Sequence, residues 1–165
     1  TVWGHGLSCH MCLLRPKSRG EVTLKSADPN EDPKIDPRFL THPNDIKDMI
    51  AGYKEMMKVL KEHPVSKYTS KHVERPVDIN DDKDIEEAIR ESADTVYHPV
   101  GTCKMGNDES SVVDKTLKVH GISGLRVIDA SIMPTLVGGN TNAPTIMIGE
   151  KGSDLVLCDW VEKAV

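Results

Sequence analysis

Two parts of the chain carry apolar residues at the three- and four-residue steps that are typical of an amphipathic helix. In the first, residues 45–63, the apolar side chains recur along one face. They are Ile46, Met49, Ile50, Tyr53, Met56, Met57 and Leu60. Thr41 or His42 can cap this helix, because Pro43 suits its first turn and Asp45 favours its N-terminal end. The pattern therefore predicts a capped helix over this range.

The second helical pattern begins with Asn80, Asp81 and Asp82, which together offer a cap and an acidic first turn. Its apolar line comprises Ile85, Ala88 and Ile89, with Ser92 or Ala93 as extensions. This helix must end before His98, because Pro99 follows and the residue before a proline is disfavoured in the α region. His98 is therefore expected at a helix exit, in extended conformation.

Shorter apolar runs near the start of the chain predict extended structure. Residues 9–14 and 21–26 are expected to be extended segments, joined by the basic turn 15–20. Residues 27–43 contain four prolines, and residues 64–79 are also polar and bounded by proline. We expect irregular connections in these two stretches.

The C-terminal third of the chain alternates between β-type and helical patterns. Residues 111–128 are expected to form strands broken by glycine, of which residues 125–128 have the composition of a buried strand. Residues 133–144 follow as a loop, and a helix is expected from about Pro144 to Trp160. Candidates for its inner face are Ile146, Gly149, Gly152, Leu155 and Trp160.

Composition narrows the class of protein. The chain has 165 residues, of which 38% are apolar and 28% charged, as in a globular domain. The net charge of −5, without a block of Lys or Arg, argues against a nucleic-acid or anionic-membrane surface. No apolar run approaches the roughly 18 residues that a membrane span requires. The chain begins with Thr1 in mid-pattern, so we interpret it as part of a longer protein.

Cysteine and histidine near the start invite a zinc hypothesis. The four cysteines, Cys9, Cys12, Cys103 and Cys158, are too few and too scattered to indicate a disulfide scaffold, and they leave the compartment open. Cys9 and Cys12, with His5 and His10 beside them, provide one ligand pair, but no second pair follows at the spacing of a structural zinc site. Strand alternation would also place these two thiols on opposite faces. No metal site is expected.

His98 stands in the segment YHPVGTCKMG, residues 97–106, among small and apolar neighbours. A lone histidine is more often structural, but no carboxylate follows before Asp108. A neutral imidazole in such surroundings is available as a proton acceptor near neutral pH. A nucleophilic pair with Cys103 is disfavoured, because the two face opposite sides of an extended run. Structural and catalytic roles both stay open from this segment alone.

Asn140 and Asn142 lie in GGNTNAP, residues 138–144, directly before the last expected helix. Turn chemistry alone accounts for such residues. The glycine pair also permits close backbone approach to a ligand, and a helix N-terminus offers N–H groups to an oxygen. Asp129 and Ser131, at the end of the expected strand, are equally suited to capping a turn or to contacting a ligand.

The strings YHPVGTCKMG and VVDKTLKVHGISGLRVIDASIMPTLVGGNTNAPTIMIGEKGSDLV resemble the C-terminal portion of the glucose–methanol–choline (GMC) family of FAD-dependent oxidoreductases. LLRPKSRGEVTL and IDPRFLTHPND resemble the same region, so the likeness covers nearly the whole chain, in a style closest to the insect glucose-dehydrogenase-like branch. It implies a mixed α+β and α/β fold. Residues 1–100 would mainly belong to a substrate domain, an antiparallel sheet with flanking helices. Residues 101–165 would return to a Rossmann-like FAD domain and supply its last strand and helix.

The same resemblance implies roles for individual residues. His98 would face the flavin and the alcohol carbon and accept the hydroxyl proton as hydride leaves for flavin N5. Asn140, ten residues before Glu150, occupies the partner position and would hydrogen-bond the developing alkoxide. The implied contacts to FAD are Tyr97, Asp129, Ala130, Asn140, Thr141 and Asn142.

The chain also departs from the family pattern. Its only G-x-G, Gly4-His5-Gly6, lacks the third glycine of a dinucleotide fingerprint. We therefore expect the N-terminal FAD-binding unit to be absent and the fragment by itself to be inactive. The alternative hypothesis is a truncated, non-catalytic binding or interaction module. The implied partners are a small alcohol or sugar and a quinone or oxygen as electron acceptor, and only the family branch suggests secretion.

Overall fold

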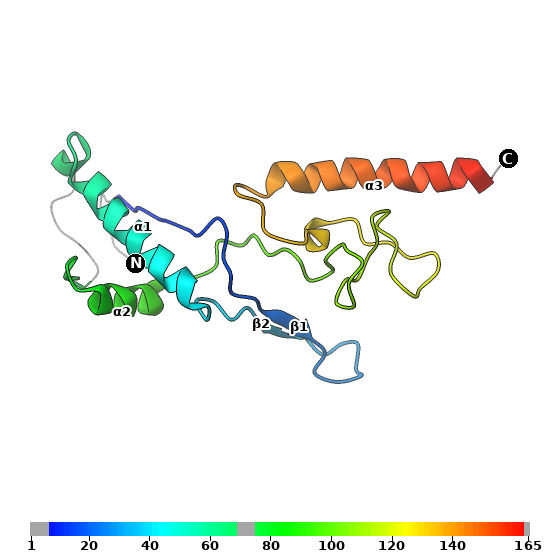
Figure 1. Ribbon diagram of the computed structural model, residues 1–165, viewed down its shortest axis with the longest axis horizontal. Helices are drawn as coiled ribbons and strands as arrows, with labels where there is room; N and C mark the ends of the chain where they lie inside the picture. Colours follow the sequence, from blue (N-terminus) through cyan, green and yellow to red (C-terminus); the bar gives the residue numbers. More distant parts are fainter. Residues whose placement is uncertain (1–6, 69–74, 164–165) are drawn as a thin grey trace. The chain divides into compact units, whose positions relative to one another are not determined.

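The computed structural model describes residues 7–68 and 75–163, with side chains up to Trp160 (Figure 1). Gly4, His5 and Gly6 lie outside the described residues. The chain divides into two compact units: Thr1–Gly20 with Asp36–Val96, and Glu21–Ile35 with Tyr97–Val165. The substrate and FAD roles expected for residues 1–100 and 101–165 stay predictions.

Helix α1, Pro43–Lys61, confirms the first expected helix. Of the two candidate caps, His42 is the one that acts, since its Nδ1 accepts the backbone N–H of Asn44 at 3.2 Å. Proline stands in the first turn as expected. A short 3-10 helix, η1, Val65–Lys67, follows α1.

Helix α2, Asp82–Ser92, confirms the second expected helix. The Asp81 side chain caps it by accepting the Lys83 backbone N–H at 2.9 Å. Ile85 and Ile89 are buried against Ile46 of α1, and Figure 1 draws the two helices side by side. These three isoleucines form the core of the first unit, so the helical spacing read from the sequence correctly identified its inner faces.

A buried carboxylate holds the basic turn 15–20 onto α1. Asp45 is only 2% exposed, and its oxygens accept the backbone N–H groups of Lys17 and Ser18 at 2.7 and 2.8 Å. The Ser18 hydroxyl donates to the same carboxylate at 2.6 Å and accepts the His42 N–H at 3.0 Å. Burial alone would raise the pKa of Asp45, but the hydrogen bonds from Ser18 and Lys17 lower it overall.

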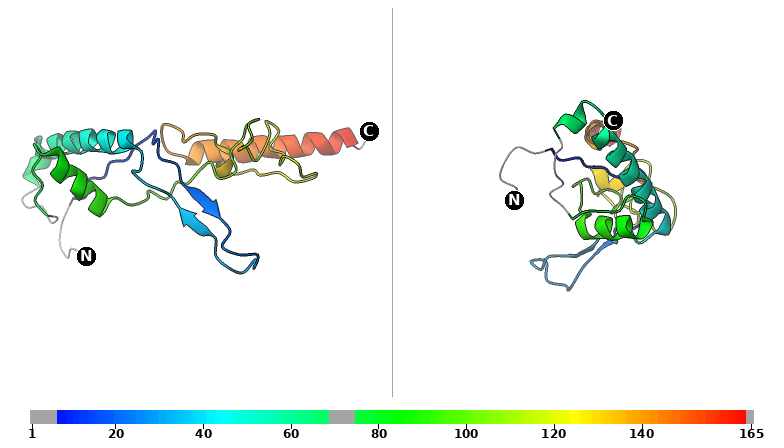
Figure 2. Two further views of the ribbon diagram at one scale, coloured as in Figure 1. Left: turned by 60° about the horizontal axis from the view of Figure 1, so that its bottom comes forward. Right: turned by 90° about the vertical axis from the view of Figure 1, so that its left-hand side faces the viewer.

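The two named strands of the described residues, β1, Glu21–Thr23, and β2, Lys34–Asp36, pair as an antiparallel hairpin (Figure 2, left). Strand β1 lies within the expected extended segment 21–26. Strand β2 lies in the stretch expected to be irregular, so that expectation was wrong for residues 34–36. Residues 9–14, expected to be an extended segment, belong to neither of the two strands. Strand formation depends on a hydrogen-bonding partner, which residues 34–36 find in β1 and which a local pattern does not reveal.

Residues 111–128 are held by isolated bridges rather than by the regular strands that were expected. The bridges pair Met105 with Val113, Val113 with Val119, and Lys118 with Arg126. Turns interrupt the ladder, because Leu117, Gly121 and Gly124 all have positive φ angles. Within residues 125–128, only Arg126 takes part in a described bridge, so the expected buried strand is reduced to one pairing.

Helix α3, Asn142–Lys163, confirms the last expected helix and begins two residues earlier than expected. Ile148 of α3 lies in the second core with residues of the preceding segments and of a short 3-10 helix, η2, Ala130–Ile132. The other buried members are Val113, Leu117, Ile132 and Met133. No helix of the described residues is long and apolar enough to span a membrane.

The inner face of α3 was only partly predicted. Gly152 is buried and Leu155 half-buried, as expected. Ile146, Gly149 and Trp160 are exposed, which corrects the expected face. Apolar residues occur all round this helix, so its sequence alone did not identify which side packs on the described core.

Candidate active site

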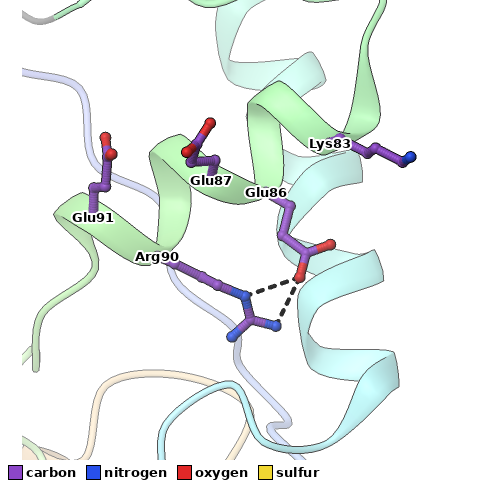
Figure 3. Close-up of a pocket in the computed structure, with 5 residues that line it drawn as sticks. All are labelled: Lys83, Glu86, Glu87, Arg90 and Glu91. Carbon is purple, nitrogen blue, oxygen red and sulfur yellow. Dashed lines mark hydrogen bonds and ion pairs between the residues drawn. The ribbon is translucent and has the colours of Figure 1, made fainter.

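A shallow hollow on α2 is lined only by charged side chains of that one helix (Figure 3). The lining residues are Lys83, Glu86, Glu87, Arg90 and Glu91. Glu86 and Arg90 pair with each other at 2.8 Å, and Glu87 and Glu91 pair with Arg75. Ion pairs along a solvated helix face account for this cluster, and it offers no enclosed site for a ligand.

The segment that carries His98 leaves α2 and crosses to η2. Helix α2 ends at Ser92, so His98 lies beyond a helix exit as the sequence predicted. The backbone N–H of Cys103 donates to the Ser131 carbonyl at 3.0 Å, and that of Met105 to the Ile132 carbonyl at 2.8 Å. These two bonds fix the position of the segment a few residues after the histidine.

The backbone on either side of His98 is unusual. Tyr97 has φ 61°, a left-handed conformation that is uncommon for a residue other than glycine. Gly101 has φ 89°, and a Cβ there would lie 3.3 Å from the Met133 carbonyl oxygen. Glycine adopts a positive φ readily, but the left-handed Tyr97 is strained, and strain of this kind is concentrated at functional sites, so Tyr97 supports a functional interpretation of this segment.

The structure brings His98 together with Thr141, which is the residue just before α3. The Thr141 hydroxyl oxygen and the His98 Nδ1 are 2.8 Å apart. Thr141 is 7% exposed, whereas the His98 side chain is exposed. The imidazole is therefore held at one nitrogen, while its Nε2 has no hydrogen-bond partner among the described residues.

Asn140 and Asn142 shape the start of α3. The Asn140 side-chain oxygen accepts the Asn142 backbone N–H at 2.8 Å, in the manner of an Asx turn. Because the oxygen is engaged in this way, the side-chain amide N–H groups are what Asn140 can offer to another oxygen. Asn140 is exposed and is the immediate neighbour of the threonine that contacts His98.

Asp129 and Ala130 lie at the start of η2. The Asp129 side chain accepts the Ser131 backbone N–H at 2.8 Å, so it caps this short helix. This is the capping role that the sequence left open beside ligand contact. Tyr97, Asp129, Ala130, Thr141 and Asn142 all stay predictions as contacts to a cofactor.

The thiols do not form a cluster in the described part of the chain. Cys9, Cys12 and Cys158 are exposed, Cys103 is half-buried, and all four are unpaired by disulfides. Among residues 7–68 and 75–163, no three His, Cys, Asp or Glu side chains lie close enough together to hold a metal ion. His5, the remaining member of the zinc hypothesis, lies outside the described residues.

Charged side chains tie the far part of α3 to the bridged segment. Asp159 pairs with Lys118 at 2.8 Å and with Arg126 at 3.0 Å, and the Arg126 Nε donates to the Thr116 carbonyl at 3.0 Å. Hydrogen bonds from Lys118 and Arg126 lower the pKa of Asp159. This cluster fixes α3 against the second core.

Comparison with known proteins identifies the family. The model of the C-terminal part of GMC oxidoreductases matches residues 16–149. The chain is 49% identical over 154 residues to an alcohol dehydrogenase [acceptor] of Pseudomonas putida, which covers 93% of this chain and 28% of that protein. It is 42% identical over 153 residues to an oxygen-dependent choline dehydrogenase of Cronobacter sakazakii, with 93% and 27% coverage. The chain thus spans less than a third of the length of these relatives.

Solved structures give the same result for the fold. A formate oxidase of Aspergillus oryzae superposes with a TM-score of 0.84 at 33% identity, over 89% of this chain and 26% of that one. A pyridoxine 4-oxidase from Mesorbium loti gives a TM-score of 0.80 at 28% identity, over 86% of this chain and 28% of that one.

These findings identify the class of protein as the flavoprotein oxidoreductases, with the mixed fold expected from the sequence. The chain belongs to the GMC oxidoreductase family and corresponds to its C-terminal domain. Its likeness to the insect glucose-dehydrogenase-like branch stays a prediction.

Sequence reasoning missed the contact between Thr141 and His98. It singled out both residues, but it treated Thr141 as a cofactor contact only. A usable signal was present in the order Thr141-Asn142-Ala143-Pro144, since a proline at the third helical position removes an N–H that a capping threonine would otherwise accept.

Proposed function

We propose that this chain contributes the substrate-activating side of an FAD-dependent enzyme that oxidises CH–OH groups. The observation that carries this proposal is the 2.8 Å contact from His98 to Thr141, which places the imidazole beside the residue next to Asn140. A proton acceptor and an amide donor from segments 42 residues apart in sequence are thus gathered at the start of α3. Membership of the GMC family supports the same proposal.

The start of α3 has the properties that an FAD contact needs. The first N–H groups of a helix have no acceptor within it, so the backbone N–H of Ala143, the second residue of α3, is suited to donate to an oxygen of the cofactor. Apart from Gly139 itself and its two chain neighbours, no atom of the described residues lies within 4 Å of the place that a Cβ on Gly139 would occupy, which leaves room for a ligand close to the backbone. We propose Tyr97, Asp129, Ala130, Asn140, Thr141 and Asn142 as the contacts of this chain to FAD.

His98 acts as proton acceptor in this proposal. FAD, when bound, supplies the acceptor for the hydride that leaves the alcohol carbon. Removal of the hydroxyl proton raises the electron density on that carbon, and the unprotonated Nε2 of His98 accepts this proton. The His98 side chain is exposed, so its Nε2 is accessible to a substrate.

Asn140 stabilises the oxygen from which the proton leaves. Its side-chain oxygen is engaged by the Asn142 N–H, so its amide N–H groups are oriented as donors to an oxygen that gains negative charge. Asn140 does not titrate, so one basic group is expected to dominate the pH dependence of the rate.

The substrate class that we propose is a small alcohol, with sugars as the alternative that the glucose-dehydrogenase-like resemblance suggests. Relatives named for alcohol and choline support the first class. The same names include an unspecified acceptor and oxygen, so we propose either a quinone or oxygen as the electron acceptor. We further propose that residues 1–165 alone are inactive, because their sequence contains no complete glycine-rich dinucleotide loop.

The test uses the complete enzyme that contains this chain, purified with its flavin and mixed anaerobically with a panel of primary alcohols, choline and hexoses. Loss of the oxidised-flavin absorbance with alcohols is the expected result. Bleaching by hexoses alone would favour the sugar alternative. A colourless protein that ignores added FAD would refute the proposal and favour a non-catalytic binding module.

A further inference from the structure

We infer that Thr141 is a positioning residue that fixes the tautomer and the orientation of the His98 imidazole. This inference rests on the proposed function, in which Nε2 of His98 accepts the substrate proton. It assigns to Thr141 a role that is distinct from contact with a cofactor, and it follows from how the threonine is held at the start of α3.

Thr141 is the N-cap residue of α3. The helix begins at Asn142, and the Thr141 carbonyl accepts the first intrahelical bond from the Thr145 N–H at 3.0 Å. The Thr145 hydroxyl donates to the same carbonyl at 2.7 Å. With its side chain nearly buried at 7% exposure, Thr141 has little freedom to rotate or shift. Its hydroxyl is therefore a fixed point against which another group can be oriented.

The hydroxyl is not used as an N-cap threonine normally uses it. Such a side chain accepts the N–H of the second or third helical residue. Here the third helical residue is Pro144, which has no N–H, so only the second, Ala143, could provide the usual donor. The proline thus removes one of the two usual partners of the Thr141 hydroxyl, and the structure directs the hydroxyl to His98 Nδ1, 2.8 Å away.

The protonation of the ring follows from the role proposed for Nε2, not from the contact alone, since a threonine hydroxyl can donate or accept. A neutral imidazole carries one N–H, and a base at Nε2 requires that this proton reside on Nδ1. The Nδ1–H then donates to the Thr141 oxygen, and the same bond remains when Nε2 takes up the substrate proton. With the hydroxyl oxygen as acceptor, Thr141 stabilises the active tautomer before the reaction and the charged ring after it.

The backbone of the histidine segment is anchored independently of Thr141. The bonds from Cys103 to Ser131 and from Met105 to Ile132 hold the segment on η2. Loss of the Thr141 hydroxyl should therefore release the ring without releasing the segment. This separation predicts a change in the tautomer and in the rate of reaction with only a small change in folding.

The test compares Thr141→Val, which keeps the shape and removes the hydroxyl, with Thr141→Ser, which keeps the hydroxyl. The control is Thr135→Val, a change at an exposed loop threonine. In the complete enzyme at alkaline pH, nitrogen NMR of labelled histidine reports which ring nitrogen carries the proton, and the spectrum of His98→Gln assigns the signal. We expect the Nδ1–H tautomer in the wild type and in Thr141→Ser, and a shift toward Nε2–H in Thr141→Val.

Turnover provides the second readout. We expect Thr141→Val to lower kcat on the order of 10–100-fold with little change in KM, as with outer hydrogen-bond partners of metal-bound histidines, and Thr141→Ser to retain most of it. A wild-type ring that is mainly Nε2–H would overturn the inference even if Thr141→Val failed to fold. Equal impairment of the serine and valine variants, or wild-type behaviour of the valine variant, would do the same. Full turnover of His98→Gln would instead refute the proposed function.

Discussion

At the scale of single residues, Asn140 combines two tasks that can be separated. Its side-chain oxygen supports the first turn of α3 by accepting the Asn142 N–H, while its amide N–H groups are the proposed donors to the substrate oxygen. Aspartate can perform the first task and not the second, since a carboxylate has acceptors only. Variants of this residue can therefore separate its effect on the stability of α3 from its effect on the rate of the reaction.

We predict that Asn140→Asp lowers kcat about 10²-fold or more, the usual effect of losing one donor to a developing oxyanion, and leaves the melting temperature nearly unchanged. Asn140→Ala should lower both kcat and stability, the latter by about 1 kcal/mol, because it also removes the acceptor. Steady-state kinetics and thermal unfolding of both variants are the measurements. An aspartate variant with wild-type kcat would show that the amide does not serve the reaction.

Asp45 shows how a single buried carboxylate makes stability depend on pH. Its pKa is lowered in the folded state by the bonds from Ser18 and Lys17, which outweigh the effect of burial. A group with a depressed folded pKa contributes stability that is present above its unfolded value, 3.8, and is lost as the pH falls through the folded value. The sequence placed Asp45 only near a helix N-terminus and gave no sign of the turn that it holds.

We predict that Asp45→Asn lowers the free energy of unfolding at neutral pH by about 2 kcal/mol, because the amide keeps one uncharged acceptor oxygen and turns an NH2 group toward a donor that the other carboxylate oxygen had accepted. The variant should also lose less stability than the wild type between about pH 5 and pH 2. Denaturant unfolding across this range is the measurement, with Asp48→Asn, an exposed acid on the same helix, as the control. If the free energy of unfolding of the wild type and of Asp45→Asn changed with pH along parallel curves, the role assigned to the Asp45 carboxylate would be contradicted.

At the scale of elements, the helices were predicted well because their signals are local. Spacing and capping residues identified α1, α2 and α3 to within a few residues at most ends. Strand β2 and the bridges of residues 111–128 depend on partners elsewhere in the chain, which a local pattern does not contain. The contact of His98 with Thr141 joins two such distant segments, so the sequence named both residues without predicting that they meet.

Helix α3 provides a matched pair of glycines. A Cβ on Gly152 would lie 2.2 Å from Cγ2 of Ile128, whereas a Cβ on Gly149 would meet no atom of the described residues within 4 Å outside the backbone of its own helix. We predict that Gly152→Ala destabilises the fold by about 1–3 kcal/mol through overpacking. Gly149→Ala should be neutral or stabilising by up to about 1 kcal/mol, because alanine favours the helix. Chemical denaturation measures both, and an equal response would show that α3 does not pack on Ile128 as described.

At the scale of the whole molecule, the chain carries a candidate proton acceptor but spans less than a third of the relatives that it matches. Several large apolar side chains of α3 are exposed in the described residues, namely Ile146, Met147, Leu157 and Trp160. A helix that is apolar on most sides is typical of a buried element. Cofactor binding is therefore a property that we assign to the complete enzyme rather than to residues 1–165.

We predict that residues 1–165, expressed alone, bind no stoichiometric FAD, whereas the complete enzyme containing them does. The physical reason is that the sequence lacks a complete glycine-rich loop for the pyrophosphate. Titration of each protein with FAD, followed by flavin fluorescence, measures the difference. Tight binding by residues 1–165 alone would show that the contacts at the start of α3 suffice.

The most direct measurement for the central claim is the rate at which an alcohol reduces the bound flavin under anaerobic conditions in the complete enzyme. Replacing His98 with Gln should slow this step by about 10²–10⁴-fold, the usual contribution of a general base, while FAD stays bound. His120→Gln, a change at an exposed histidine bonded to the Gly106 carbonyl, should react like the wild type. Flavin reduction in His98→Gln within a few-fold of the wild-type rate would contradict the role of His98 as the proton acceptor.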